Sequence, residues 1–267
     1  MSKSSEREAG PTLPAAEAGS ARESAWLAGV LAFAAGCVDA SGYLTLFHLF
    51  TAHMSGNSAA LGAYLGQGDW RAALHRAFPI PVFIVGVALG AAIVETGVRR
   101  GYRSSFSLAL ACEAALLGAF ALFGGRLFPP ATAPPVAWEF YGLAALLPLA
   151  MGVQNATLRR VGGQRIRTTY VTGMLTDLAE TAVEALYASR RPGAGGVPAE
   201  SSWCRVGLLA AIWSAFIAGA VAGGLAVLYW RQWALLLPLA LLAGAIGVDL
   251  VRPVELRRQR GKSEAPE

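Results

Sequence analysis

Two acidic residues lie within long apolar stretches of this chain, where a charged group is costly. Asp39 is the fourteenth residue of the stretch 26–47, and Glu113 is the ninth residue of the stretch 105–124. An ionisable side chain inside a membrane span usually faces the bundle interior or a water-filled cavity. Asp39 is therefore a candidate for binding an ion, a proton or a small polar solute, with Glu113 as a second buried acid. The alternative for Asp39 is a carboxyl group that only caps a helix.

A short polar segment follows the first apolar stretch and carries the expected partners of Asp39. It contains His53, Ser55, Gly56 and Asn57. Glycine beside a hydroxyl at a helix tip lets backbones approach closely and leaves N–H groups free for a polar solute. We expect His53, Ser55 and Asn57 to contact Asp39, and all four residues to line the same pathway. Close packing of the helix tip, with glycine serving only sterics, is the alternative.

The same pattern of small and polar residues occurs twice in the chain. The four segments are GCVDA at 36–40, MSGN at 54–57, GVQNA at 152–156 and VTGM at 171–174. This order indicates an internal duplication. In membrane proteins, matching interruptions of two apolar halves point to a translocation site. The second copy adds four candidate residues: Gln154, Asn155, Thr172 and Gly173. The two amides could instead tie helices together.

The composition indicates an integral membrane protein. Hydrophobic residues make up 55% of the chain, charged residues 15%, and the mean hydropathy is +0.47. Six stretches are apolar nearly all round and reach the roughly 20 residues that a helix needs to cross a bilayer. They are 26–47, 78–98, 105–124, 138–158, 204–229 and 232–251. We therefore expect an all-α membrane protein with about six transmembrane helices.

Two further segments, 51–65 and 168–187, decide the topology. The first is too short to cross easily, and the second carries Asp177, Glu180 and Glu184, an acidic stripe that lipid would reject. If neither segment crosses, 18 of the 22 lysines and arginines lie on the cytoplasmic side, as the positive-inside rule favours. Three crossings per half then make the repeats inverted, each with a short re-entrant or broken helix.

The expected organisation is a membrane domain between two tails. Residues 1–24 form a disordered cytoplasmic tail and 253–267 a basic cytoplasmic tail, because neither has a sustained apolar pattern. The membrane domain, 25–252, contains a first repeat at 26–124 and a second at 138–251. Matching small-residue motifs, Gly86/Gly90 and Gly219/Gly223, predict close helix contacts in both repeats.

Several other activities find no support in the sequence. His48 and His53 match no metal site, and we find no cofactor pattern and no nucleophile spaced with a base, so we expect no enzyme. The net charge of +5 is explained by the cytoplasmic arginines, and we expect a lipid bilayer rather than nucleic acid as the partner. The glycine motifs fit packing within the chain or in a homo-oligomer.

Four ordered strings resemble a known family. GCVDASGYL, FTAHMSGNSAALG, MGVQNATLRR and TTYVTGMLTDL are similar to the YoaK-like family of bacterial inner-membrane proteins of unknown function. The resemblance covers about residues 26–251. It departs at Ser55-Gly56-Asn57, where the family pattern is similar to Thr-Gly-Asn. The resemblance implies the inner membrane and a polytopic helical fold, and it implies no substrate.

Two classes of function remain from the sequence. The preferred one is a small channel or secondary transporter for a small polar solute or ion, with a site at the repeat interface. The alternative is a non-transporting membrane scaffold or regulatory protein.

Overall fold

The computed structural model describes residues 15–102, 104–127, 138–158, 171–190 and 199–251. All its regular elements are helices, and none of the described residues lies in a strand. The α-helices are α1 (Ala15–Thr45), α2 (Met54–Gly66), α3 (Trp70–Ala77), α4 (Pro79–Arg99), α5 (Ser105–Phe123), α6 (Trp138–Ala144), α7 (Leu146–Leu158), α8 (Val171–Arg190), α9 (Ala199–Trp230) and α10 (Leu236–Val251). Short 3-10 helices, η1 (Gly124–Leu127) and η2 (Arg231–Leu235), follow α5 and α9.

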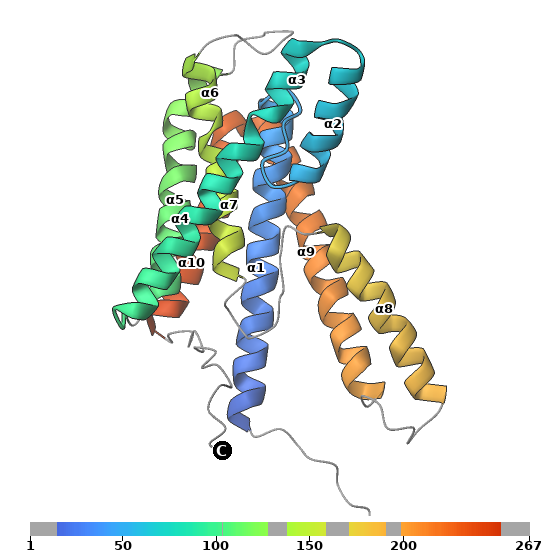
Figure 1. Cartoon of the computed structure of the whole chain (residues 1–267). Coiled ribbons are helices and arrows are strands. Elements are labelled where there is room, and N and C mark those ends of the chain that lie inside the picture. Colours follow the sequence, from blue (N-terminus) through green and yellow to red (C-terminus); the bar gives the residue numbers. More distant parts are fainter. Residues whose placement is uncertain (1–14, 103, 128–137, 159–170, 191–198, 252–267) are drawn as a thin grey trace, which may run out of the picture.

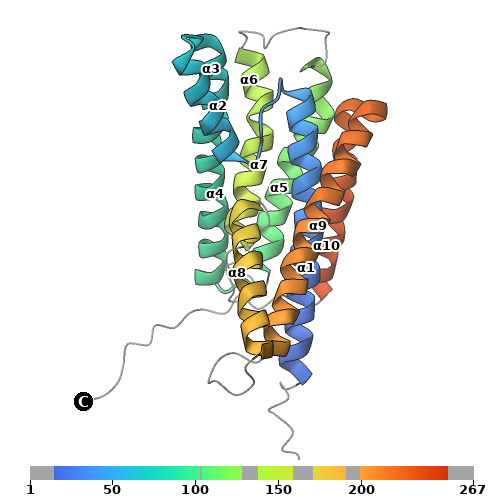
Figure 2. The same ribbon diagram turned by 90° about the vertical axis from the view of Figure 1, so that its right-hand side faces the viewer.

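The long helices run side by side as a bundle (Figure 1). α1 packs on α9 and α10, while α7 packs on α4 and α5. The helices α2 and α8 lie on the outside of the bundle at opposite ends, as both views show (Figure 2). α2 packs mainly on α3, and α8 packs on α9.

Within the described ranges, four helical stretches are long and apolar enough to cross a membrane: Ala25–Thr45, Trp70–Arg99, Ser105–Phe123 and Glu200–Val251. The last contains two helices, α9 and α10, which run in opposite directions (Figure 1). The expected span 138–158 is divided at Ala145 into α6 and α7, each of which is shorter than a bilayer crossing. The membrane character expected from the sequence is therefore found. The break falls just before Pro148, a residue that bends a helix because its ring removes the N–H that would bond the carbonyl of Ala144.

The first helix begins earlier than expected. Residues 15–24, assigned to a disordered tail from the sequence, form the start of α1. They are rich in alanine and glutamate, which favour helix without any apolar stripe. The rest of that tail, 1–14, and the basic tail 253–267 lie outside the described residues.

Glycines create the closest helix contacts, as the two motifs predicted. On α9, a Cβ at Gly219 or Gly223 would overlap the backbone of α1 at Phe33 or Cys37. A Cβ at Gly36 of α1 would in turn overlap the carbonyl oxygen of Phe216. Only glycine lets two helix backbones approach this closely.

The contact between α4 and α7 is made in the same way. A Cβ at Gly86 would overlap the carbonyl oxygen of Leu149, and one at Gly90 would crowd the backbone of Val153. Gly152 of α7 faces the carbonyl oxygen of Phe83. The predicted close approach is confirmed in both halves of the bundle.

Candidate functional site

The site forms where the chain turns back after α1. Phe47 and His48 adopt φ values of 52° and 64°, and the chain then returns alongside α1 before α2 begins at Met54. Asp39 lies six residues before the end of α1 at Thr45, which is about 9 Å along a helix axis. The returning chain reaches Asp39, so α2 begins at the level of Asp39 rather than at the end of α1. Its 13 residues span about 20 Å, less than a bilayer.

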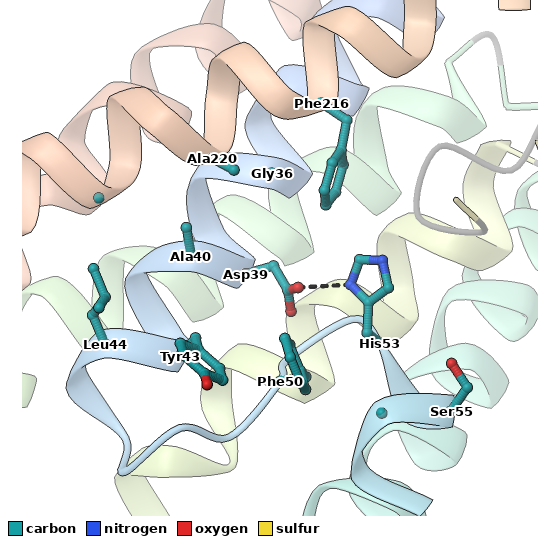
Figure 3. A pocket seen from close by; sticks show the side chains of 12 residues that line it. Gly36, Asp39, Ala40, Tyr43, Leu44, Phe50, His53, Ser55, Phe216 and Ala220 are labelled. Atoms are coloured by element: carbon teal, nitrogen blue, oxygen red, sulfur yellow. Dashed lines mark hydrogen bonds and ion pairs between the residues drawn. The ribbon is translucent and has the colours of Figure 1, made fainter. Parts of the chain in front are cut away.

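The Asp39 carboxylate holds the returning segment. Its Oδ1 accepts hydrogen bonds from the backbone N–H of Thr51 (2.7 Å), the hydroxyl of Thr51 (3.0 Å) and the backbone N–H of Ala52 (2.8 Å). Its Oδ2 lies 2.6 Å from Nδ1 of His53, as Figure 3 shows. This length is typical of a charge-assisted hydrogen bond. Asp39 is 5% exposed, so these four contacts compensate a buried charge.

Of the three partners expected for Asp39, His53 makes the contact. Asn57 instead binds the backbone of Phe50: its Oδ1 accepts from the Phe50 N–H (3.2 Å), and its Nδ2 donates to the Phe50 carbonyl (2.7 Å). Asn57 is fully buried. The amide therefore ties the returning segment to the first turn of α2. Ser55 and Gly56 lie beside His53 in the same turn.

A cavity of about 500 Å³ opens beside the Asp39–His53 pair. It lies between α1, the start of α2, and α9 (Figure 3). Its polar lining residues are Asp39, His53, Ser55 and Tyr43. The other lining residues are apolar or glycine: Gly36, Ala40, Leu44, Phe50, Gly56, Phe216, Ala220 and Gly224. The volume is within the range of small-molecule sites.

The remaining candidate residues lie outside the lining of this cavity. Gln154 is fully buried in α7, and its Nε2 donates to the carbonyl oxygen of Leu31 in α1 (3.0 Å). Asn155 is half-buried next to it. Thr172 and Gly173 form the first turn of α8, which packs on α9. The structure thus gathers the first copy of the repeated motif, and not the second, around the cavity.

Glu113 is fully buried in the middle of α5. Neither of its carboxyl oxygens has a hydrogen-bond partner among the described residues. Another buried acid, Asp249 of α10, accepts hydrogen bonds from the hydroxyls of Ser104 and Ser107 at the start of α5. The two buried acids of α5 and α10 therefore differ in their hydrogen bonding. Asp249 is compensated by neighbours, while Glu113 carries the cost of burial without them.

Sequence reasoning missed Thr51 and the aromatic residues of the cavity. Thr51 supplies two of the four contacts to Asp39, and a threonine four residues before Ser55 is a weak signal. Phe216 comes from α9, far along the chain, and stacks edge-on against His53 with ring centroids 5.4 Å apart. Only the three-dimensional fold brings Phe216 and His53 together.

Helices of this length and apolarity, packed through glycine contacts, define a polytopic α-helical membrane protein. A family model described as "Protein of unknown function (DUF1275)" matches residues 27–248. The chain belongs to this family, and the resemblance inferred from the four sequence strings is confirmed.

The chain is also similar to a curated bacterial protein, the UPF0700 transmembrane protein YoaK of Bacillus subtilis (strain 168). The two are 32% identical over 155 residues, which is 58% of this chain and 65% of the relative. The match thus spans a little less than two thirds of the relative. No solved structure matches the chain.

Proposed function

We propose that the protein is a small channel or secondary transporter in the inner membrane, with its solute site in the cavity beside Asp39 and His53. The observation that carries the proposal is the return of the chain to a buried carboxylate inside a spanning helix. Non-helical backbone within a bilayer is found only where it is buried in protein or lines a cavity, because its polar groups need partners. The proposal assigns no catalytic reaction and no resident cofactor.

Matched glycine contacts support a duplicated fold. Gly36 and Gly152, 116 positions apart, face the carbonyl oxygens of Phe216 and Phe83, which are 133 positions apart. The same two separations in sequence, 116 and 133 positions, relate the other contacts. The contact of Gly219 with Phe33 corresponds to that of Gly86 with Leu149. The contact of Gly223 with Cys37 corresponds to that of Gly90 with Val153. One packing arrangement used twice is the expected result of a repeat.

The directions of the helices support inversion. α2 and α8 follow corresponding copies of the repeated motif and lie at opposite ends of the bundle (Figures 1 and 2). The proposed topology has six crossings, α6 and α7 together forming one of them. The end at which α1 finishes faces outward, and both termini are cytoplasmic. Transporters built from inverted repeats place their site near the repeat interface.

One observation favours the scaffold alternative. Asp39 is engaged in four contacts that hold the returning segment, which a purely structural carboxylate would also do. The variant Asp39→Asn separates the two functions. Its Oδ1 can still accept from Thr51 and Ala52, whereas the charge opposite His53 is removed. A scaffold would tolerate this change, and a solute site whose His53 is held in place by the Asp39 carboxylate would not.

The test measures the distribution of solutes between cells and medium by mass spectrometry in cells that produce the chain. The matched control is Asp69→Asn, because Asp69 caps α3 from an exposed position (Ala72 N–H, 3.0 Å) and asparagine caps equally well. We expect wild type and Asp69→Asn to shift the same solutes, and Asp39→Asn to lose the shift at equal membrane abundance. The scaffold alternative is favoured if wild type shifts no solute or if Asp39→Asn behaves as wild type.

A further inference from the structure

We infer that the cavity beside Asp39 takes an uncharged amphipathic small molecule, with an apolar body and one hydrogen-bonding group, rather than an ion. The inference concerns binding at the site of the proposed function, and it rests on that function for the claim that the bound molecule is moved. It follows from four features of the cavity. These are the hydrogen bonds already made by the Asp39 carboxylate, its pairing with His53, the apolar lining of the cavity and the position of the cavity mouth.

The Asp39 carboxylate has little capacity left for a cation. Oδ1 accepts three hydrogen bonds, from the N–H and hydroxyl of Thr51 and the N–H of Ala52, and Oδ2 is paired with His53. A cation bound directly to Asp39 could use only the remaining lone pair of Oδ2, in competition with His53. Displacing a contact of Oδ1 would cost more, because two of those contacts come from buried backbone N–H groups that would be left unpaired.

The negative charge of Asp39 already has a partner. The 2.6 Å separation of His53 Nδ1 from Asp39 Oδ2 is the length of a charge-assisted hydrogen bond. A cation would compete with His53 for the carboxylate, and an anion would be repelled by it. An unpaired ion surrounded by apolar groups costs several kcal/mol or more, so a neutral solute is favoured.

The walls of the cavity are apolar. Phe50 and Phe216 present rings on either side of His53, with centroids 5.9 Å and 5.4 Å from the imidazole. Small residues of α1 and α9 complete the walls. A volume of about 500 Å³ accommodates a molecule with an apolar body, and the polar atoms of His53, Tyr43 and Ser55 can orient one polar group.

The cavity opens on the side of the bundle. Leu44, at its edge, is 52% exposed, and Ser55 is also exposed. Leu44 is the penultimate residue of the candidate span Ala25–Thr45, so the mouth of the cavity lies on the side of the bundle near one end of this span. An amphipathic molecule whose polar group lies at the bilayer interface therefore has a short path into the cavity.

Three photoreactive probes test the inference. They share a hexadecyl chain with a mid-chain diazirine and differ in the head group, which is a hydroxyl, a trimethylammonium or a sulfate. The purified protein in lipid nanodiscs is irradiated with each probe, and labelled peptides are identified by mass spectrometry. We expect the alcohol to label peptides containing 36–44 and 216–224, and an excess of unlabelled hexadecanol to suppress that labelling.

Two leucine substitutions on α9 provide a matched pair. A Cβ at Gly224 would meet only Leu44 Cδ1, at 3.8 Å, so Gly224→Leu fills the cavity without a backbone clash. Gly207 has nothing within 4 Å of its Cβ position, and Gly207→Leu is the control. Saturable labelling by the alcohol should fall about tenfold in Gly224→Leu, as a loss of about 1.4 kcal/mol in binding gives, and remain in Gly207→Leu.

Two results would overturn the inference. One is labelling of the same peptides by the trimethylammonium or sulfate probe that is as strong as that by the alcohol. The other is alcohol labelling that does not saturate or is equal in the two leucine variants, which is contact with bulk lipid. Because the readout is binding, it is independent of flux. Saturable alcohol binding with no solute movement would contradict the proposed transport and keep the binding site. Movement of an ion through a path that depends on Asp39 would support transport and overturn the inference of an uncharged solute.

Discussion

The side-chain amide of Asn57 forms two hydrogen bonds with the backbone of Phe50, one with its N–H and one with its carbonyl. These bonds cross from α2 to the returning segment seven residues earlier. Asn57 is fully buried, so water does not compete for either group. The amide thus performs the pairing that a neighbouring strand would provide, in a segment that has no regular structure of its own.

The first prediction follows from this pairing. Asn57→Ala removes two hydrogen bonds and leaves the Phe50 backbone groups without partners, which should cost about 2–4 kcal/mol. Thermal unfolding of the purified protein should show this as a decrease in Tm of roughly 5–10 °C. Ser58→Ala is the control, because the Ser58 hydroxyl makes a hydrogen bond to the Met54 carbonyl from an exposed position. Equal decreases for the two variants would show that the Asn57 amide does not hold the segment.

The second prediction concerns the helix crossings. Gly36→Ala and Gly152→Ala each place a Cβ where a carbonyl oxygen of the facing helix lies, so the helices must separate. Overpacking of this kind typically costs about 1–3 kcal/mol. Both variants should lower the Tm and the yield of monodisperse protein on size-exclusion chromatography.

Gly29→Ala is the comparison on the same helix. No atom lies within 4 Å of the Cβ position at Gly29, and alanine favours helix over glycine by up to about 1 kcal/mol. Its Tm should be unchanged or slightly higher. If Gly29→Ala and Gly36→Ala lower the Tm equally, close approach at Gly36 is not the reason that glycine is needed.

The third prediction contrasts the two buried acids on α5 and α10. Glu113 has no hydrogen-bond partner among the described residues, so Glu113→Leu removes a buried polar group without stranding another. Its Tm should be unchanged or higher. Asp249→Leu leaves the hydroxyls of Ser104 and Ser107 without their acceptor and should cost about 1–3 kcal/mol. A decrease for Glu113→Leu as large as that for Asp249→Leu would mean that the Glu113 carboxyl is compensated by bound water.

Much of the fold could be predicted from the sequence because membrane helices carry strong local signals. The apolar stretches anticipated the long helices, and the glycine pairs anticipated the helix contacts. Two boundaries differ from the expected ones. Pro148 indicates a bend near Ala145, but hydropathy does not change there and gave no sign of two separate helices. The helix before Trp26 is formed by residues whose signal is helix propensity rather than apolarity.

The candidate site was only partly accessible from the sequence. Asp39 and His53 could be paired because a carboxylate inside a span needs a nearby polar partner. The apolar character of the cavity could not be predicted from the sequence, because Phe216 and Gly224 come from α9 and lie near Asp39 only through tertiary packing. That character changes the expected solute from polar or ionic to uncharged and amphipathic.

The last prediction concerns topology and uses single cysteines in a chain whose three native cysteines are replaced. His48 follows α1, Gln67 follows α2 and Arg100 follows α4, and all three are exposed. If α2 returns to the side from which the chain came, cysteines at His48 and Gln67 should both react with a membrane-impermeant thiol reagent in intact cells. A cysteine at Arg100 should react only after permeabilisation, because α3 and α4 together form a span of 30 residues between Gln67 and Arg100. Reaction of His48 and Gln67 from opposite sides would mean that α2 crosses the bilayer, which would remove the re-entrant segment and with it the main support for a transport site.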